Sequence, residues 1–195
     1  MQYDQINGVF DDIVVINDSI NVNIKRFSAK ERSGVTLKKL KGKFTVSPKG
    51  IICRSMRVET EESDLRLYAS IKTDSWKTYS YFIDSADCFL FLQRGSKVGM
   101  KDATYWAPML KGFDQKCEIG AIIKGTVADA KCSFLEMKTG DTYIKGKGSV
   151  KGLPNIEETV FDVELSELKS SSQDFNQIQF GEMLSDVKLP ELLNS

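Results

Sequence analysis

The sequence predicts a mainly β protein, a curled antiparallel meander with two or three short helices. The first observation is an alternation of apolar and polar residues along most of the chain, as in residues 117–127. Successive side chains of a strand point to opposite faces, so this pattern predicts ribbons with one apolar and one polar side. The second observation is a turn signal about every dozen residues, which is typical of antiparallel hairpins.

The N-terminal part predicts two strands, at residues 13–16 and 20–24, separated by Asn17-Asp18-Ser19. A further turn is expected at residues 30–34. The alternation in residues 35–46 slips by one position at Lys38-Lys39, and a slip of one residue reverses the faces of a strand. We therefore expect a β-bulge or bend there.

Pro48 and Gly50 give a strong turn signal, because they stand where a β-turn prefers these residue types. Residues 51–58 form the returning strand in this interpretation, residues 60–64 the next turn, and residues 65–72 another strand.

Two interruptions of the alternation predict helices. Residues 74–86 carry aromatic and apolar side chains at three- to four-residue spacing behind a candidate N-cap, Asp74 or Ser75. Residues 102–112 begin at a candidate cap, Asp102, and contain Pro108, which restricts them to a short or kinked helix. Residues 88–93 between them predict an apolar strand.

The remaining chain resumes the strand pattern at residues 131–137, 142–151 and 161–165. Gly146, Gly148 and Gly152 predict a flexible or bulged region. Residues 182–193 predict a weak helix broken at Pro190. The chain is thus expected to be a single β segment over residues 1–195, an excerpt of a longer repetitive protein, with residues 182–195 as a weakly ordered helix or tail.

Composition excludes several classes of function. Lys plus Arg and Asp plus Glu number 27 each, and no basic stripe of the kind required for nucleic-acid binding is visible. Histidine is absent, which removes the commonest general base and metal ligand. The four cysteines include no CxxC spacing, and we expect no metal, no cofactor and no catalytic thiol. The thiols are interpreted as small buried hydrophobes. A disulfide stays open as an alternative, because spacing does not assign a pairing. No segment approaches the length needed to span a bilayer, and no targeting signal is present in the sequence.

Enzymatic activity is not expected. The carboxylate pairs Asp11-Asp12, Glu61-Glu62 and Glu157-Glu158 are adjacent in sequence, so they point apart in strands or lie in solvated turns. The lysines of residues 38–41 are interpreted as an ordinary solvated face, although such a cluster also suits anionic lipid headgroups.

A sheet with one apolar face must bury that face. Alternation alone fits a closed sandwich core as well as an open trough occupied by a ligand. An acyl chain of about 16 carbons gains roughly 13 kcal/mol on leaving water, at about 0.8 kcal/mol per methylene. A continuous apolar trough would therefore assist lipid movement without any catalytic residue.

The order of several short motifs along the chain resembles the middle of the large AsmA/TamB-like proteins of the Bacteroidetes. The resemblance covers approximately residues 10 to 180, and no single motif in it is chemically diagnostic. The motifs are Phe27-Ser28-Ala29-Lys30-Glu31-Arg32-Ser33-Gly34, Leu37-Lys38-Lys39-Leu40, Val46-Ser47-Pro48-Lys49-Gly50-Ile51, Asp74-Ser75-Trp76, Tyr81-Phe82-Ile83, Tyr105-Trp106-Ala107-Pro108-Met109-Leu110-Lys111-Gly112, Lys124-Gly125-Thr126-Val127 and Gly152-Leu153-Pro154-Asn155-Ile156-Glu157-Glu158-Thr159.

This resemblance implies a segment of a long periplasm-spanning protein with an inner-membrane anchor and a taco-like β-groove. The implied function is phospholipid transport or outer-membrane biogenesis. The implied partners are phospholipid acyl chains, outer-membrane proteins and the flanking segments of the parent chain. The candidate groove-facing residues share the register of the apolar strand positions: Leu40, Phe44, Val46, Leu65, Leu67, Ile71, Ile119, Ile123, Val127, Phe161, Val163 and Leu165.

Two other functions remain open on the sequence. A closed sandwich that binds carbohydrate would use Trp76, Trp106, Tyr79, Tyr105 and Tyr143 to stack on sugar rings. A scaffold for outer-membrane protein assembly would instead pair an exposed edge strand with a strand of its client.

Overall fold

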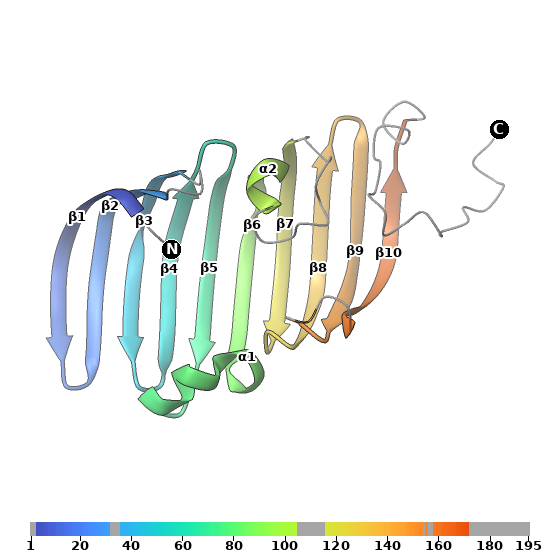
Figure 1. Ribbon diagram of the computed structural model, residues 1–195. Coiled ribbons are helices and arrows are strands. Elements are labelled where there is room, and N and C mark those ends of the chain that lie inside the picture. Colours follow the sequence, from blue (N-terminus) through green and yellow to red (C-terminus); the bar gives the residue numbers. More distant parts are fainter. Residues whose placement is uncertain (1–2, 32–35, 105–115, 154, 156–157, 172–195) are drawn as a thin grey trace.

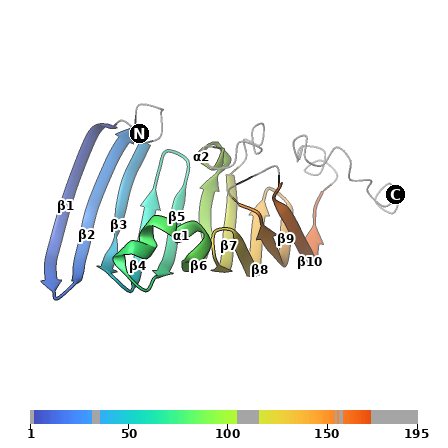
Figure 2. The same ribbon diagram turned by 60° about the horizontal axis from the view of Figure 1, so that its bottom comes forward.

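In the part of the chain that the structure describes, ten antiparallel strands form one unclosed, curled sheet, and they lie side by side in the order of the chain (Figures 1 and 2). This computed structural model describes residues 3–31, 36–104, 116–153, 155 and 158–171. The strands are β1 (Tyr3–Ile16), β2 (Ser19–Glu31), β3 (Thr36–Ser47), β4 (Gly50–Glu59), β5 (Asp64–Lys72), β6 (Asp87–Gly99), β7 (Lys116–Gly125), β8 (Asp129–Thr139), β9 (Thr142–Lys151) and β10 (Val160–Lys169). The predicted mainly β, curled antiparallel meander is therefore confirmed.

Short turns connect several of these strands, where Gly, Pro, Asn and Asp predict them. Two residues join β1 to β2, β3 to β4, and β8 to β9. Asn17 and Gly140 adopt positive φ angles of 50° and 53° in the first and third of these turns. Tight turns of this kind place consecutive strands beside each other, which produces a meander rather than a crossover topology.

Bulges set the register at several positions. The predicted irregularity at Lys38-Lys39 is confirmed, because three steps from Leu37 to Leu40 on β3 face two steps from Ala29 to Phe27 on β2. In β4 the ladder is interrupted between Cys53 and Met56, and Ser55 has a φ of 51°. A bulge adds a residue to one strand and bends it, so these positions contribute to the curl of the sheet.

Gly146 allows the backbones of β9 and β10 to approach closely. A Cβ atom at this position would lie 2.5 Å from the carbonyl oxygen of Glu164. The residue is paired in register with Leu165 on β10. The sequence predicts flexibility or a bulge in this region, and the structure assigns to the glycine a close contact between strands instead.

The prediction of two or three short helices is wrong in its detail. Residues 74–86 contain a 3₁₀ segment, η1 (Trp76–Tyr81), and one α turn, α1 (Phe82–Ser85). Near Asp102 the described residues contain only the turn α2 (Met100–Ala103), and the predicted helix at 182–193 lies outside the described residues. Helices this short are marginal without an apolar stripe to bury, and segment 76–85 lies at the ends of strands rather than across a face (Figure 1).

Hydrogen bonds hold the 73–86 segment against the turns at that end of the sheet. Thr73 N–H donates to the Lys49 carbonyl over 3.1 Å, and the Tyr79 hydroxyl donates to the Ser47 carbonyl over 2.7 Å. Ala128 N–H donates to the Ile83 carbonyl over 3.3 Å. Among the helical turns that the structure describes, none is long and apolar enough to cross a membrane.

Candidate functional site

One face of the sheet is apolar along all ten strands. Residues paired directly across an antiparallel ladder point to the same side, so the register assigns each side chain to a face. Starting from the pair Leu90 and Ile123, the assignment extends in both directions, and the buried hydroxyl residues Ser96, Thr139 and Thr142 lie among the apolar ones. We call this side the apolar face, and its larger members are Ile6, Phe10, Val15, Ile20, Val22, Ile24, Phe27, Leu37, Leu40, Phe44, Val46, Ile51, Met56, Val58, Leu65, Leu67, Ile71, Leu90, Leu92, Val98, Ile119, Ile123, Leu135, Met137, Ile144, Val150, Phe161, Val163, Leu165 and Leu168.

The structure brings eleven of the twelve predicted groove-facing residues together on the apolar face. They are Leu40, Phe44, Val46, Leu65, Leu67, Ile71, Ile119, Ile123, Phe161, Val163 and Leu165. Val127 is placed differently, because β7 ends at Gly125 and residues 126–128 form the connection to β8. The Asp129 N–H donates to the Thr126 hydroxyl over 3.0 Å there, so the expectation that the strand continues through Val127 is wrong.

The apolar face is packed at its centre and open at its rims. Cys117 and Ala121 on β7 are 2% and 3% exposed. On β10, Phe161 and Val163 are 48% and 59% exposed. All strands in the described part of the chain belong to this one sheet, so no second sheet of that part covers the face.

All four cysteines lie on the apolar face as free thiols. Cys117 is buried, whereas Cys53, Cys88 and Cys132 are half-buried. Burial raises the pKa of each thiol above its ordinary value, so the groups are less reactive than exposed cysteines. The interpretation of the thiols as small hydrophobes agrees with this placement.

The opposite, polar face carries an apolar stripe that the sequence reasoning missed. Tyr68, Phe91, Ile122 and Phe134 are paired one to the next across β5, β6, β7 and β8. Phe91 is 41% exposed, and the Arg94 guanidinium lies 4.6 Å from the centre of the Phe134 ring. The sequence carried this signal only at Ile122, which breaks the alternation of its strand. Phe134 keeps the two-residue spacing of Ala130 and Cys132, and the register shift after Cys132 places it on the polar face.

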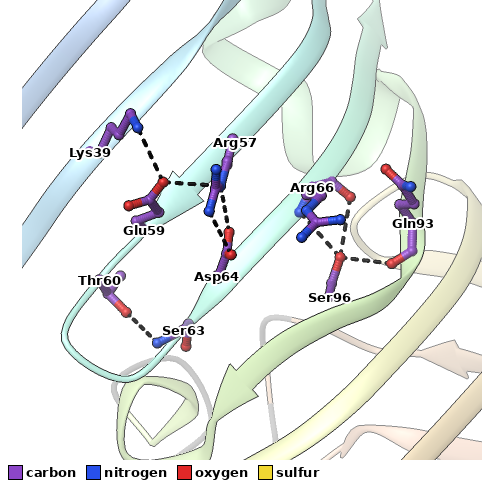
Figure 3. A network of polar contacts seen from close by, with 9 residues as sticks. All are labelled: Lys39, Arg57, Glu59, Thr60, Ser63, Asp64, Arg66, Gln93 and Ser96. Carbon is purple, nitrogen blue, oxygen red and sulfur yellow. Dashed lines mark hydrogen bonds and ion pairs between the residues drawn. The ribbon is translucent and has the colours of Figure 1, made fainter.

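A polar network crosses the ends of β3, β4 and β5 on the same face (Figure 3). Arg57 donates two hydrogen bonds of 2.8 Å to the two carboxylate oxygens of Asp64, and its Nε lies 3.0 Å from Glu59 Oε1. Lys39 Nζ lies 3.4 Å from the same Glu59 oxygen. The hydrogen bonds from Arg57 lower the pKa of Asp64 against the opposing effect of its partial burial.

Ser96 closes the interrupted ladder between β5 and β6 (Figure 3). Its side chain is fully buried, and its hydroxyl accepts a hydrogen bond of 3.1 Å from the Arg66 N–H. The same hydroxyl lies 2.7 Å from the Gln93 carbonyl, to which it donates. The Ser96 hydroxyl takes the place of a main-chain hydrogen-bond partner from the opposite strand. The Arg66 N–H and the Gln93 carbonyl therefore keep a hydrogen bond where the ladder between β5 and β6 is interrupted.

Of the adjacent carboxylates considered as catalytic candidates, Glu61 and Glu62 bind different lysines. Glu61 lies 2.6 Å from Lys38 Nζ, and Glu62 lies 2.8 Å from Lys116 Nζ. Asp11 pairs with Lys25 over 3.0 Å. These carboxylates form separate surface ion pairs, and Glu157 lies outside the described residues.

The aromatic residues considered for sugar binding do not gather into one platform within the described ranges. The rings of Trp76 and Tyr79 stack with centroids 5.6 Å apart at the end of the sheet. Tyr143 lies on β9, on the polar face. Tyr105 and Trp106 lie outside the described residues.

Comparison with known proteins gives no relative for this chain: no family model, no curated protein and no solved structure matches it.

Proposed function

We propose that this chain is a non-enzymatic segment of a periplasm-spanning, AsmA/TamB-like protein, and that its apolar face shields phospholipid acyl chains in a taco-like groove. The single observation that carries the proposal is an apolar face that continues over ten strands in one unclosed sheet. The order of motifs quoted above supports the assignment to this class of protein. The proposal includes outer-membrane biogenesis as the process and flanking segments of a longer chain as partners.

The extent of the face favours a long hydrocarbon over a small ligand. Ten strands at about 4.8 Å spacing give a surface roughly 43 Å wide. Exposed apolar patches on monomeric proteins rarely exceed a few hundred Å², and larger ones mark interaction surfaces. An acyl chain offers apolar contact along its whole length and requires no hydrogen-bonding partner from the face.

The apolar face offers little to a chemical step. Its larger side chains are aliphatic or aromatic, its thiols have pKa values raised by burial, and the hydroxyl side chains Ser96, Thr139 and Thr142 on it are buried. A surface of this kind stabilises a lipid by contact alone, which suits transport without covalent chemistry.

The test is recovery of phospholipid with the purified chain. Native mass spectrometry under gentle conditions is expected to show bound phospholipid, and a photo-reactive amino acid at position 123 is expected to crosslink to it. The matched control is the same photo-reactive group at position 124, the neighbouring residue on the opposite face of β7. A lipid-free, cooperatively folded monomer, or equal crosslinking from both positions, contradicts the proposal.

The open sheet edges favour a second candidate function, a β-edge scaffold for outer-membrane proteins. Within the described residues, strands β1 and β10 each pair with one neighbouring strand, and Val9, Ile13 and Val160 on them are exposed. A long apolar edge strand is a template for pairing with another chain. Crosslinking from edge positions to an unfolded barrel protein, with no lipid captured at position 123, would favour this candidate over lipid transport.

A further inference from the structure

The polar face carries an unbalanced group of cations on β3, β4 and β5, on the side of the sheet away from the apolar face. Lys41 faces Arg57 directly across the β3–β4 ladder, and Arg57 faces Arg66 across the β4–β5 ladder. Lys43 faces Arg54 one step further along. Like charges placed directly opposite each other destabilise an antiparallel pair, so this arrangement costs folding stability.

Ion pairs neutralise only part of this group. Arg57 is held by Asp64 and Glu59, at 2.8 and 3.0 Å. For Lys41 and Arg66 the described residues provide no carboxylate within ion-pair distance, and the Arg54 guanidinium contacts only the Thr45 hydroxyl, at 3.3 Å. Asp64 and Glu59 already bind Arg57, so Lys41, Arg54 and Arg66 have no ion-pair partner of their own among the described residues.

Four of these cations line an open hollow of about 610 Å³. We call it the basic hollow, and it is lined by Lys41, Arg54, Arg57 and Arg66 together with Tyr68 and Phe91 among other residues. None of the described lining residues is acidic. The bulge at Ser55, with its φ of 51°, lies in the lining and adds an extra residue between Arg54 and Arg57.

Aromatic side chains form the rim of the basic hollow on the β6 side. Tyr68 and Phe91 face each other across the β5–β6 ladder. The Phe89 ring meets the Tyr68 ring edge-on, with centroids 5.9 Å apart, which fixes the Tyr68 ring beside the cations. Phe91 is exposed and Tyr68 is half-buried. Rings next to arginines suit a ligand that combines negative charge with a flat or cyclic body.

We propose that the basic hollow binds a phosphate ester carried on a cyclic group. The phosphate oxygens lie among Lys41, Arg54 and Arg66, and the ring lies against Tyr68 and Phe91. Arginine donates in a planar fork that matches phosphate oxygens, and lysine adds a point charge. This site is on the opposite side of the sheet from the acyl-chain face. The proposal can therefore be tested independently of the proposed lipid function.

Calorimetric titration of the purified chain with phenyl phosphate tests the proposal. We expect phenyl phosphate to bind more tightly than inorganic phosphate, and neutral phenol to give no measurable binding. Lys41→Gln and Arg66→Gln are each expected to weaken phenyl phosphate about tenfold, since each removes a charge-assisted hydrogen bond. Phe91→Leu is expected to weaken phenyl phosphate while the affinity for inorganic phosphate stays unchanged.

Lys124→Gln is the matched control, because Lys124 faces Lys131 in another like-charge pair on the polar face but does not line the basic hollow. It is expected to leave phenyl phosphate binding unchanged. Urea unfolding of each variant verifies the fold, and removal of an opposed like charge is expected to preserve it.

Absence of binding to the wild type, equal loss in Lys124→Gln, or equal affinity for inorganic phosphate overturns the proposal. Binding only to vesicles of anionic phospholipid overturns it as well, because the hollow would then be a membrane-surface patch.

Discussion

The two faces of this sheet are built by the same strands. They differ in whether their side chains find partners within the described part of the chain, apolar cover on one face and opposite charges on the other. The apolar face continues from β1 to β10 without a facing layer in the described part of the chain. The polar face divides into two regions. Over β8, β9 and β10 opposite charges lie across from each other, as in Glu136–Lys145 and Lys147–Glu164, whereas over β3, β4 and β5 cations lie across from cations.

In the C-terminal polar region, charged side chains pair with opposite charges on the neighbouring strand. Lys147 and Glu164 form an ion pair of 3.0 Å, and Asp129 approaches Lys151 at 4.0 Å. In the N-terminal polar region, cations lack carboxylate partners among the described residues. The apolar face lacks a facing layer there. The two proposed ligands, a phosphate ester and an acyl chain, therefore differ in chemistry and lie on opposite sides of one sheet.

The largest expected effect comes from placing a charge on the apolar face. Ile123→Asp is expected to lower the free energy of unfolding by about 2 kcal/mol, because it removes a packed apolar side chain and partly buries a carboxylate. Lys124→Asp, one residue away on the polar face, is expected to change it by less than about 0.5 kcal/mol. Urea unfolding followed by circular dichroism measures both, and equal losses would show that the two faces are not distinct.

Removal of a carboxylate from the cation-rich region is expected to have the next largest effect. Asp64→Asn leaves Arg57 beside Lys41 and Arg66 without its two-hydrogen-bond partner. The Arg57 and Asp64 side chains are 33% and 29% exposed, so solvent screening holds the loss below about 1 kcal/mol. Glu164→Gln in the charge-matched region is the control, and its urea midpoint should stay closer to that of the wild type.

A charge reversal is expected to act with opposite sign in the two polar regions. Lys43→Glu converts the facing pair with Arg54 into an attractive one and is expected to raise stability by about 0.5 kcal/mol. Lys145→Glu places a carboxylate between Glu136 and Glu167 and is expected to lower stability by a similar amount. Thermal unfolding at low salt compares the two, and a shift in the same direction would contradict the charge assignment.

The smallest effect is the pH dependence of the Arg57–Asp64 pair. Arg57 lowers the pKa of Asp64 from its ordinary value of 3.8. A carboxyl group with a lowered folded-state pKa contributes stability above its unfolded pKa and loses that contribution as the pH falls through the folded value. The stability difference between wild type and Asp64→Asn is therefore expected to be constant near neutral pH and to shrink below pH 3.8; a constant difference down to pH 2 would refute it.

Much of the sheet was predictable from residue patterns because each strand carries its own local signal. The predicted strand at residues 142–151 coincides with β9, and the phase slip at Lys38-Lys39 marks a real bulge. The apolar face follows from the same alternation, which explains why eleven of twelve predicted residues share it. Val127 was misplaced because an apolar residue directly after a strand continues the alternation although the chain has already turned.

The basic hollow was not predictable in the same way. The sequence shows no basic stripe because the cations come from three strands, with Lys41, Arg57 and Arg66 separated by several residues each. Only the register places them opposite one another, and that register depends on bulges such as the one at Ser55. Alternation specifies the face of a residue, but it does not specify the partner across the ladder.

The order of the strands has a consequence for how the molecule holds together. Each strand packs against the strands before and after it in the chain, so stability is approximately a sum of neighbour-to-neighbour terms, as in a linear array of coupled units. Such an array unravels from its outer hairpins inward instead of melting as a block. Hairpins can also be added or removed without disturbing distant ones, so the length of the sheet is free to vary while its cross-section stays constant.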